Sequence, residues 1–422
     1  MNTFLFDYSI DEIISRPFLG IRKGGSNKTS KKRETDKNIE NNFMQKYISL
    51  EDFLKIFESR QKYTLQEFLA KAVVKVGDKT TPLKQYMKDK NINKSDIHLL
   101  FENIQARNEY LTRFYTMSLR VNKDHLKITE EAMKNKEMNN NRLVTYKNVI
   151  RNMHYKDILE NTLSGLENVP SYFAVVKDLY LNCIIDYKIL TPSAIHYMKL
   201  GRLGSVFSSF YFRASIMNPY LVYSLNHSVL KGTKIFTPTL GWTSYCFGFL
   251  ECPYVEEYVG TDVISSVCKK TKQFAKERYP NKTVEIFCQP SEDLFVSEQF
   301  KKKYREHFDV VFFSPPYYKL ELYQSKNQST SRYKTYEEWL DKYWDKTIQL
   351  CSYVLSKKGK LCYILSGYGS ENTKDNYDLL EDMNTITKKY FRLTSQQPMY
   401  NKDVHSTNHK ETSEQIMIFS KS

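Results

Sequence analysis

A rigid polar and aromatic tetrapeptide follows an apolar run in the C-terminal half of the chain. Residues 309–313 read as a buried β-strand, and Ser314-Pro315-Pro316-Tyr317 follows directly. Two successive prolines cannot continue a sheet ladder, so the strand must end at Ser314. Because ligands of open α/β sheets bind beyond the carboxyl ends of the strands, the tetrapeptide is a candidate functional site.

The residue types in this segment favour binding of an amino group on a flat ring. Each proline fixes its own φ and restricts the residue before it, so the carbonyls of Ser314 and Pro315 are held in one direction. With the Ser314 side chain, these acceptors suit the exocyclic NH2 of a nucleobase. Hydrogen bonds from that NH2 would draw its lone pair out of conjugation and make the nitrogen nucleophilic. Tyr317 offers a flat face on which an extruded base could stack.

Ser314-Pro315-Pro316-Tyr317 resembles the SPPY/DPPY/NPPY signature of the S-adenosylmethionine-dependent amino-methyltransferases of nucleic acids. Those enzymes methylate the amino nitrogen of adenine or cytosine. Further segments that are similar to the family's motifs occur in the family's order: a strand and turn at 234–243, strands at 257–262 and 283–288, and a terminal strand at 413–419. The resemblance covers roughly residues 205–420. It implies a Rossmann-like class I methyltransferase sheet with helices on both faces, an α/β fold.

The resemblance also implies a binding site for S-adenosylmethionine. The turn after the first strand would face the methionine part of the cofactor. An acid at the end of the second strand can accept both ribose hydroxyls, and Asp262 follows Gly241 at about the 20-residue spacing typical of such folds. The segment after the third strand would hold the adenine. The candidate cofactor-binding residues are Thr237, Pro238, Thr239, Gly241, Trp242, Asp262, Ser291 and Glu292.

The expected reaction is direct in-line methyl transfer to adenine N6 or cytosine N4 of a base flipped out of DNA. Ser314 and the Pro315 carbonyl would hold the amino group, and Tyr317 would stack the base. Three alternatives stay open. The target base could be adenine or cytosine, the substrate could be RNA, and the chain could be a non-catalytic nucleic-acid-binding subunit of a methyltransferase complex.

The sequence before the resemblance predicts a flexible basic segment at residues 1–45 and a mainly α-helical domain at 46–204, followed by the catalytic domain at 205–422. Ser49 and Thr64 have helix-capping spacing, the latter with Glu67. Helical patterns extend over 97–117, 143–163 and 173–189. The helical domain could recognise nucleic acid or bind a protein partner.

Charge is consistent with a polyanionic partner, since the net charge is +15 and the pI about 9.1. Lysine enrichment in an AT-rich genome would give the same composition. The loop after Tyr317 mixes basic, amide and aromatic side chains that could read bases or phosphates. The candidate nucleic-acid contacts are Arg213, Tyr318, Lys319, Lys326 and Arg332.

The seven cysteines are scattered without a Cys-x-x-Cys pair. This pattern predicts neither disulfides nor a metal site. It indicates a protein that resides in a reducing compartment. No apolar stretch reaches the length of a membrane span and no signal peptide is visible, so we expect an intracellular protein that is not secreted. The sequence leaves open whether the protein is a monomer or a homodimer.

Overall fold

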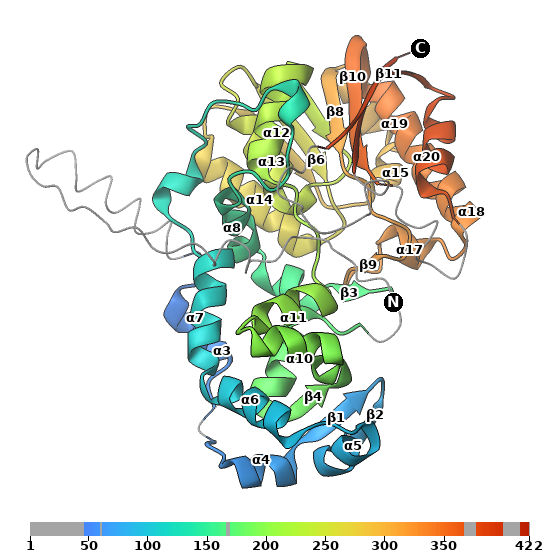
Figure 1. Cartoon of the computed structure of the whole chain (residues 1–422). Coiled ribbons are helices and arrows are strands. Elements are labelled where there is room, and N and C mark those ends of the chain that lie inside the picture. The colour runs from blue at the N-terminus through green and yellow to red at the C-terminus, as the bar shows by residue number, and fades with distance from the viewer. Residues whose placement is uncertain (1–45, 60, 166–168, 367–376, 400–413, 422) are drawn as a thin grey trace, which may run out of the picture. The chain divides into compact units, whose positions relative to one another are not determined.

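The computed structural model describes residues 46–59, 61–165, 169–366, 377–399 and 414–421 (Figure 1). The segment 1–45, predicted to be flexible and basic, lies outside these residues. The chain forms two compact units. The first comprises residues up to Leu126 together with Arg151–Glu160 and Asn168–Arg213, and the second comprises Lys127–Ile150, Asn161–Glu167 and Ala214–Ser422. The division therefore differs from a single boundary at 204/205. Two segments of the expected helical domain belong to the second unit, and residues 205–213 of the expected catalytic domain belong to the first.

The first unit is mainly helical but also holds a small sheet of order β2-β1-β4. Its core is aromatic, with Phe53 packed on Phe57, Phe114 and Phe173 at ring-centroid distances of 5.4–6.2 Å. Its elements are α3 (Leu50–Ile56), α4 (Leu65–Lys71), β1 (Val73–Val76), β2 (Lys79–Pro82), α5 (Leu83–Lys90), α6 (Lys94–Gln105), α7 (Arg107–Ser118), η1 (Lys123–Leu126), α9 (Tyr172–Lys177), η4 (Asp178–Asn182), β4 (Ile184–Asp186), η5 (Tyr187–Leu190), α10 (Pro192–Lys199) and α11 (Leu203–Phe210). The chain crosses between the units within α8 (Thr145–Met153) and at the end of η3 (Asp157–Asn161).

The helix caps predicted in this unit are present. The Ser49 side chain accepts the Asp52 N–H at the start of α3, and Thr64 and Glu67 form a complete capping box at the start of α4. The helix predicted over 97–117 is divided between α6 and α7. The helix predicted over 173–189 is wrong for 184–186, because these residues form β4, which pairs with β1 in parallel.

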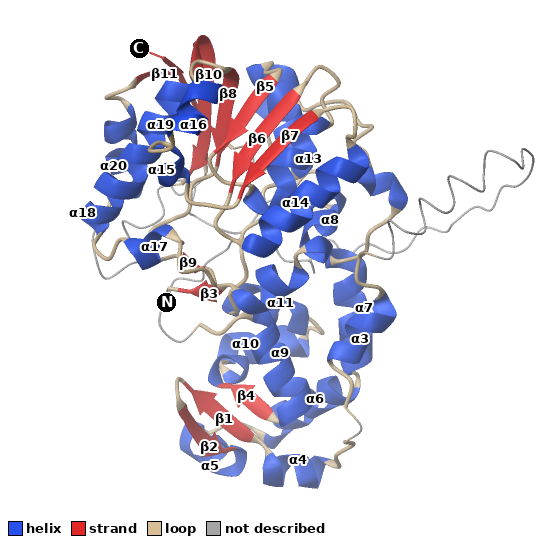
Figure 2. Ribbon diagram, turned by 180° about the vertical axis from the view of Figure 1, so that it is seen from behind, coloured by secondary structure: helices blue, strands red, loops and turns tan. Residues whose placement is uncertain are grey.

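The second unit is built on a seven-stranded sheet of order β11-β12-β10-β8-β5-β6-β7 (Figure 2). All pairs from β10 to β7 are parallel, and β12 pairs antiparallel with both β10 and β11. The strands are β5 (Lys234–Thr237), β6 (Glu257–Thr261), β7 (Thr283–Phe287), β8 (Phe308–Phe313), β10 (Leu355–Leu365), β11 (Phe391–Pro398) and β12 (Gln415–Lys421). The predicted Rossmann-like α/β fold is confirmed.

Helices cover both faces of this sheet, α13 and α14 on one face and α15, α16 and α19 on the other (Figure 2). This separation follows from right-handed crossovers that run in opposite directions on the two sides of β5. The helical elements are η2 (Asn135–Glu137), α12 (Pro219–Leu225), η6 (Asn226–Leu230), η7 (Gly241–Thr243), α13 (Ser244–Leu250), α14 (Ser265–Arg278), α15 (Ser291–Leu294), α16 (Glu298–Tyr304), α17 (Ser329–Arg332), α18 (Tyr336–Trp339), η8 (Leu340–Asp345), α19 (Lys346–Val354) and α20 (Leu379–Thr387).

The register of β5 and β8 is fixed by a carboxylate at the start of β8. Asp309 accepts hydrogen bonds from the N–H groups of Thr233 and Lys234 at 2.9–3.0 Å. Successive connections leave β5 toward β6 on one side and return to β8 on the other, so the carboxyl ends of β5 and β8 form a topological switch point. Such a point is where open α/β sheets bind ligands.

Candidate active site

The Ser-Pro-Pro-Tyr segment lies at the carboxyl end of β8, as the sequence predicts. The Ser314 N–H donates to the hydroxyl of Tyr245, a buried residue of α13, at 3.0 Å. The Tyr317 hydroxyl accepts a hydrogen bond from the N–H of Ser366, just beyond β10, at 3.0 Å. Both ends of the tetrapeptide are therefore tied to neighbouring elements, and all four of its residues line one cavity of the second unit.

Four of the five residues predicted at the turn after β5 line the same cavity: Pro238, Thr239, Gly241 and Trp242. Gly241 has a φ of +50°, and a Cβ at this position would lie 2.3 Å from the Tyr245 ring. The turn therefore requires glycine. Thr237 is different. It is fully buried, and its hydroxyl hydrogen-bonds with that of Tyr258 (2.7 Å), so it packs at the strand end and is not among the cavity residues.

Asp262, just beyond β6, lines the cavity with its carboxylate held by backbone groups. One oxygen accepts the Leu240 N–H at 3.1 Å and the other accepts the Ile264 N–H at 3.0 Å. Burial raises the pKa of Asp262, and these N–H groups oppose that shift by favouring the charged form. The Val263 N–H acts on the same carboxylate. A carboxylate has about four lone-pair sites, so Asp262 can still accept a hydroxyl from a ligand.

The residues predicted to hold adenine also line the cavity, at the end of β7. The Ser291 hydroxyl lies 3.0 Å from that of Thr347 on α19. Glu292 is buried, which raises its pKa, and it pairs with Arg332 at 2.7 Å. Arg332 also pairs with Asp293 at 2.8 Å. The Arg332 guanidinium is thus bound within the protein, where it positions α17 beside this wall, rather than being placed to contact a phosphate.

Six residues of the loop that follows the tetrapeptide line the cavity: Glu321, Tyr323, Asn327, Gln328, Ser329 and Thr330. The loop as a whole was predicted to contact nucleic acid, but none of these six residues was singled out. Leu320 closes a turn on the Tyr317 carbonyl, and β9 (Glu321–Leu322) then pairs antiparallel with β3 (Leu163–Ser164). This pairing returns the chain to the cavity. Nothing local in the sequence marks β3 and β9, since each is only two residues long and they are far apart along the chain.

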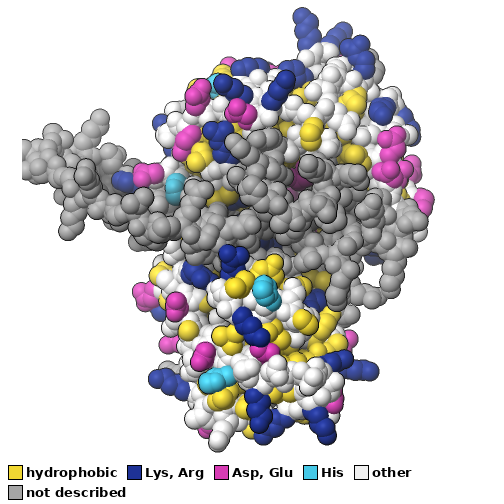
Figure 3. Space-filling view, viewed as in Figure 1, with side chains coloured by type: hydrophobic (Ala, Val, Ile, Leu, Met, Phe, Trp, Pro, Cys, Tyr) yellow, Lys and Arg dark blue, Asp and Glu magenta, His cyan; other side chains and the backbone are white. Residues whose placement is uncertain are grey.

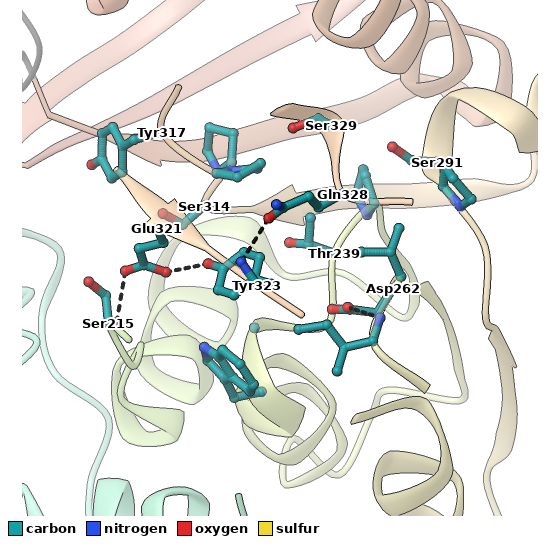
Figure 4. Close-up of a pocket in the computed structure, with 18 of the residues that line it drawn as sticks. Ser215, Thr239, Asp262, Ser291, Ser314, Tyr317, Glu321, Tyr323, Gln328 and Ser329 are labelled. Atoms are coloured by element: carbon teal, nitrogen blue, oxygen red, sulfur yellow. Dashed lines mark hydrogen bonds between the residues drawn. The ribbon is translucent and has the colours of Figure 1, made fainter. Parts of the chain in front are cut away.

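Figure 4 shows how these residues share the cavity. Ser291 and Asp262 lie at one end and Tyr317, Ser314 and Glu321 at the other, with the Tyr323 side chain between them. The cavity volume is about 150 Å³. Because sites for drug-sized ligands hold about 300–1,000 Å³, two reactants fit only if side chains that fill the cavity, Tyr323 foremost, move on binding.

The other residues predicted to contact nucleic acid lie in different surroundings. Tyr318 is buried against Tyr336 and Trp339, with ring centroids at 5.3 and 5.6 Å, and its hydroxyl donates to the Lys334 carbonyl. Its role is therefore packing. Arg213 is buried and is the last residue of the first unit.

Lys319 and Lys326 are exposed, so of the five candidates these two stay available to a polyanion. On the face shown in Figure 3, basic side chains are interspersed with acidic ones over the described surface rather than gathered in one patch.

Two searches of the described residues gave negative results. In the ranges that the structure describes, no three His, Cys, Asp or Glu side chains are grouped as metal ligands. Among the helices of those same ranges, none combines the length and the apolar character that crossing a bilayer requires.

No protein-family model and no curated protein sequence matches the chain. Solved structures resemble it over about half its length. The N-methyltransferase NodS from Bradyrhizobium japonicum WM9, in complex with S-adenosyl-L-homocysteine, is 11% identical with a TM-score of 0.31, over 48% of this chain and 83% of that one.

Two further structures are similar to the chain to the same extent. TrmN from Thermus thermophilus is 11% identical with a TM-score of 0.31, over 49% of each chain. The [4+2]-cyclase SpnF is 11% identical with a TM-score of 0.34, over 49% of this chain and 81% of that one. The names of NodS and SpnF denote different reactions, and at such identities and TM-scores the likeness does not assign a reaction to this chain.

Proposed function

We propose that the second unit binds S-adenosylmethionine and transfers its methyl group to the exocyclic amino nitrogen of a base in DNA. The observation that carries the proposal is the convergence of four strand ends on one cavity. The turn after β5, Asp262 after β6, Ser291 after β7 and the Ser-Pro-Pro-Tyr segment after β8 all line it. The order of these motifs along the chain is the order in which the amino-methyltransferases carry them.

The residues present fit the cofactor. Asp262 offers a carboxylate with a free acceptor site for a ribose hydroxyl, and Gly241 lets the turn that lines the cavity pass against the Tyr245 ring because it carries no Cβ. Ser291 lies at the far end, where the adenine would bind. When bound, S-adenosylmethionine supplies an electrophilic methyl group on a sulfonium that is a good leaving group.

The chain's own residues would act on the target base. The Ser314 side chain and the Pro315 carbonyl accept hydrogen bonds from its amino group and so orient the nitrogen. Tyr317, whose hydroxyl is fixed by the Ser366 N–H, presents its ring to the base. Fixing both reactants in line and excluding water is the protein's main contribution to the rate.

Transfer of labelled methyl groups from S-adenosylmethionine to DNA and to RNA tests this function. We expect labelled DNA with the wild-type chain. Ser314→Ala should reduce the rate by about tenfold, which corresponds to the loss of one hydrogen bond worth about 1.4 kcal/mol. Ser352→Ala, on the half-buried part of α19, is the matched control and should behave as wild type. If only RNA is labelled, the substrate is RNA and not DNA. If neither nucleic acid is labelled, the proposal is refuted.

A further inference from the structure

Glu321 is a buried carboxylate in the cavity to which the reaction proposed above gives no role. Its side chain lines the cavity together with Ser314 and Tyr317, and the residue is 8% exposed. Figure 4 shows its carboxylate at the Ser314 and Tyr317 end, away from Asp262 and Ser291. Of the residues that the structure describes, no Lys, Arg or His forms an ion pair with it. A buried acid without a cation is a candidate for chemistry rather than for stability.

The groups that do contact Glu321 keep it available as an acceptor. One carboxylate oxygen accepts the Ser215 N–H at 2.9 Å, and the other accepts the Tyr323 hydroxyl. Burial raises the pKa of Glu321, and these two donors, together with the Ser215 hydroxyl, oppose this shift. A carboxylate has about four lone-pair sites, so a site remains for a donor on a ligand.

An amino group is the ligand chemistry that this end of the cavity favours. The Pro315 carbonyl is an acceptor without a donor, and so is the Glu321 carboxylate while it is charged. The Ser314 hydroxyl can accept a hydrogen bond as well. The NH2 group of adenine or cytosine donates two hydrogen bonds. A carbonyl oxygen at the same place, as in thymine or at O6 of guanine, would leave buried acceptors unpaired and face a negative charge.

We propose that the Glu321 carboxylate shares one of the two amino N–H groups of the target base with the Ser314 hydroxyl, in a bifurcated hydrogen bond, and takes up the proton that this nitrogen loses. Glu321 is then a catalytic residue in addition to the Ser-Pro-Pro-Tyr segment. The inference rests on the proposed function. The amino nitrogen forms a bond to the methyl carbon while the carbon–sulfur bond breaks and its electron pair stays on sulfur. The nitrogen then carries one proton too many, which passes to a carboxylate oxygen of Glu321 and from there to water.

The test compares Glu321→Gln with the wild-type chain, using Glu337→Gln, an exposed glutamate of α18, as the matched control. The amide oxygen of glutamine can still accept the Ser215 N–H, but the side chain cannot take up a proton. We expect kcat for DNA methylation to fall by about 10²–10⁴-fold, the usual effect of losing a general base. The dissociation constant of S-adenosylhomocysteine, measured by calorimetry, should change less than about threefold, and the control should match wild type.

A second variant, Tyr323→Phe, tests the same contact through pH. Loss of the hydroxyl donor should raise the pKa of Glu321 in the free enzyme, so the acid limb of kcat/KM should move to higher pH. A merely structural Tyr323 would lower the rate without moving that limb.

Three results would overturn the inference, and they are distinguishable. If Glu321→Gln transfers methyl groups within threefold of wild type, Glu321 has no catalytic role and the proposed function stands. If cofactor binding weakens in parallel with the rate, the carboxylate holds the cofactor's own ammonium group and not the base. If the wild-type chain transfers no methyl group to nucleic acid, the proposed function fails and the inference fails with it.

Discussion

The hydrogen bond between Tyr245 and Ser314 gives the sharpest prediction about how the site is built. Tyr245 is 2% exposed, its ring lies 5.1 Å from that of Phe312 and nearly perpendicular to it, and its hydroxyl accepts the first N–H beyond β8. Tyr245→Phe keeps the ring and its packing and removes the hydroxyl, which accepts the Ser314 N–H and also interacts with the Thr239 side chain. Without that acceptor, the Ser314 N–H is left unsatisfied in a half-buried position.

The expected magnitude follows from the cost of an unpaired donor. Loss of one partner of a buried hydrogen bond costs about 1–3 kcal/mol. We therefore expect the free energy of unfolding in urea to fall by that amount. If the same bond orients Ser314 in the transition state, kcat should fall by roughly 5- to 150-fold, since each 1.36 kcal/mol is a factor of ten.

The assay needs both measurements and one control. Tyr353→Phe removes the hydroxyl of a half-buried tyrosine of α19. Among the described residues this hydroxyl forms no hydrogen bond, so the substitution should leave stability and rate unchanged. If Tyr245→Phe is as stable and as active as this control, then the Tyr245 hydroxyl does not position the tetrapeptide and the reasoning is refuted.

Three more predictions follow from other contacts. Asp262→Ala should weaken S-adenosylhomocysteine binding by about 10- to 100-fold in calorimetry, as expected for hydrogen bonds of about 1.5–3 kcal/mol to a charged group. Gly165→Ala should lower activity and thermal stability, because a Cβ there would lie 1.6 Å from the Lys319 carbonyl oxygen and would displace β9. Glu321→Gln should raise thermal stability at neutral pH. The pKa of Glu321 is higher in the folded state than in the unfolded state, so the free energy of unfolding falls as pH rises from the unfolded-state pKa to the folded-state pKa. Glutamine does not ionise, so the variant does not lose this stability.

Each of these predictions has an outcome that contradicts it. Wild-type cofactor affinity in Asp262→Ala would remove this carboxylate from the cofactor site. The control for Gly165→Ala is Leu163→Ala, which alters an exposed side chain of β3, two residues before Gly165, and leaves the backbone pairing intact. Equal effects of the two substitutions would contradict the steric argument. Destabilisation by Glu321→Gln at neutral pH would mean that the carboxylate is retained for structure.

Much of the second unit could be predicted from its sequence, because buried parallel strands are near-continuous apolar runs with marked ends. The predicted strands at 257–262 and 283–288 each agree with an observed strand to within one residue, and the strand and turn predicted over 234–243 contain β5. The end of β8 is fixed by Pro315 and Pro316, whose rings cannot continue a ladder. The strand β11 was not predicted by itself, because it alternates buried and exposed residues and is rich in polar side chains.

The small sheet of the first unit escaped prediction for a different reason. The hairpin of β1 and β2 has a two-residue turn at Gly77, whose φ is +61°, and this is the turn signal that the sequence offered. The flanking strands are only four residues long and lie between strong helical patterns, which dominated the interpretation. The third strand, β4, follows η4 after the single residue Cys183, whose φ is +57°. A cysteine gives no turn signal in the sequence, so nothing marked the end of the helical pattern.

The candidate site divides in the same way between local and long-range signals. Ser314, Tyr317 and Asp262 could be found because each follows a recognisable strand. Glu321 and Tyr323 could not, since their place in the cavity depends on the pairing of β9 with β3, about 160 residues earlier in the chain. Side-chain partners were equally hidden, as the ion pair of Arg332 with Glu292 shows.

The identity of the modified nucleoside tests the central claim most directly. The full chain is incubated with methyl-labelled S-adenosylmethionine and with DNA or RNA, the nucleic acid is digested to nucleosides, and the labelled product is identified by mass spectrometry. We predict a deoxynucleoside that carries the label on an exocyclic nitrogen, either N6-methyl-deoxyadenosine or N4-methyl-deoxycytidine. A label on a ring carbon or on an oxygen, or no labelled nucleoside at all, would contradict the account.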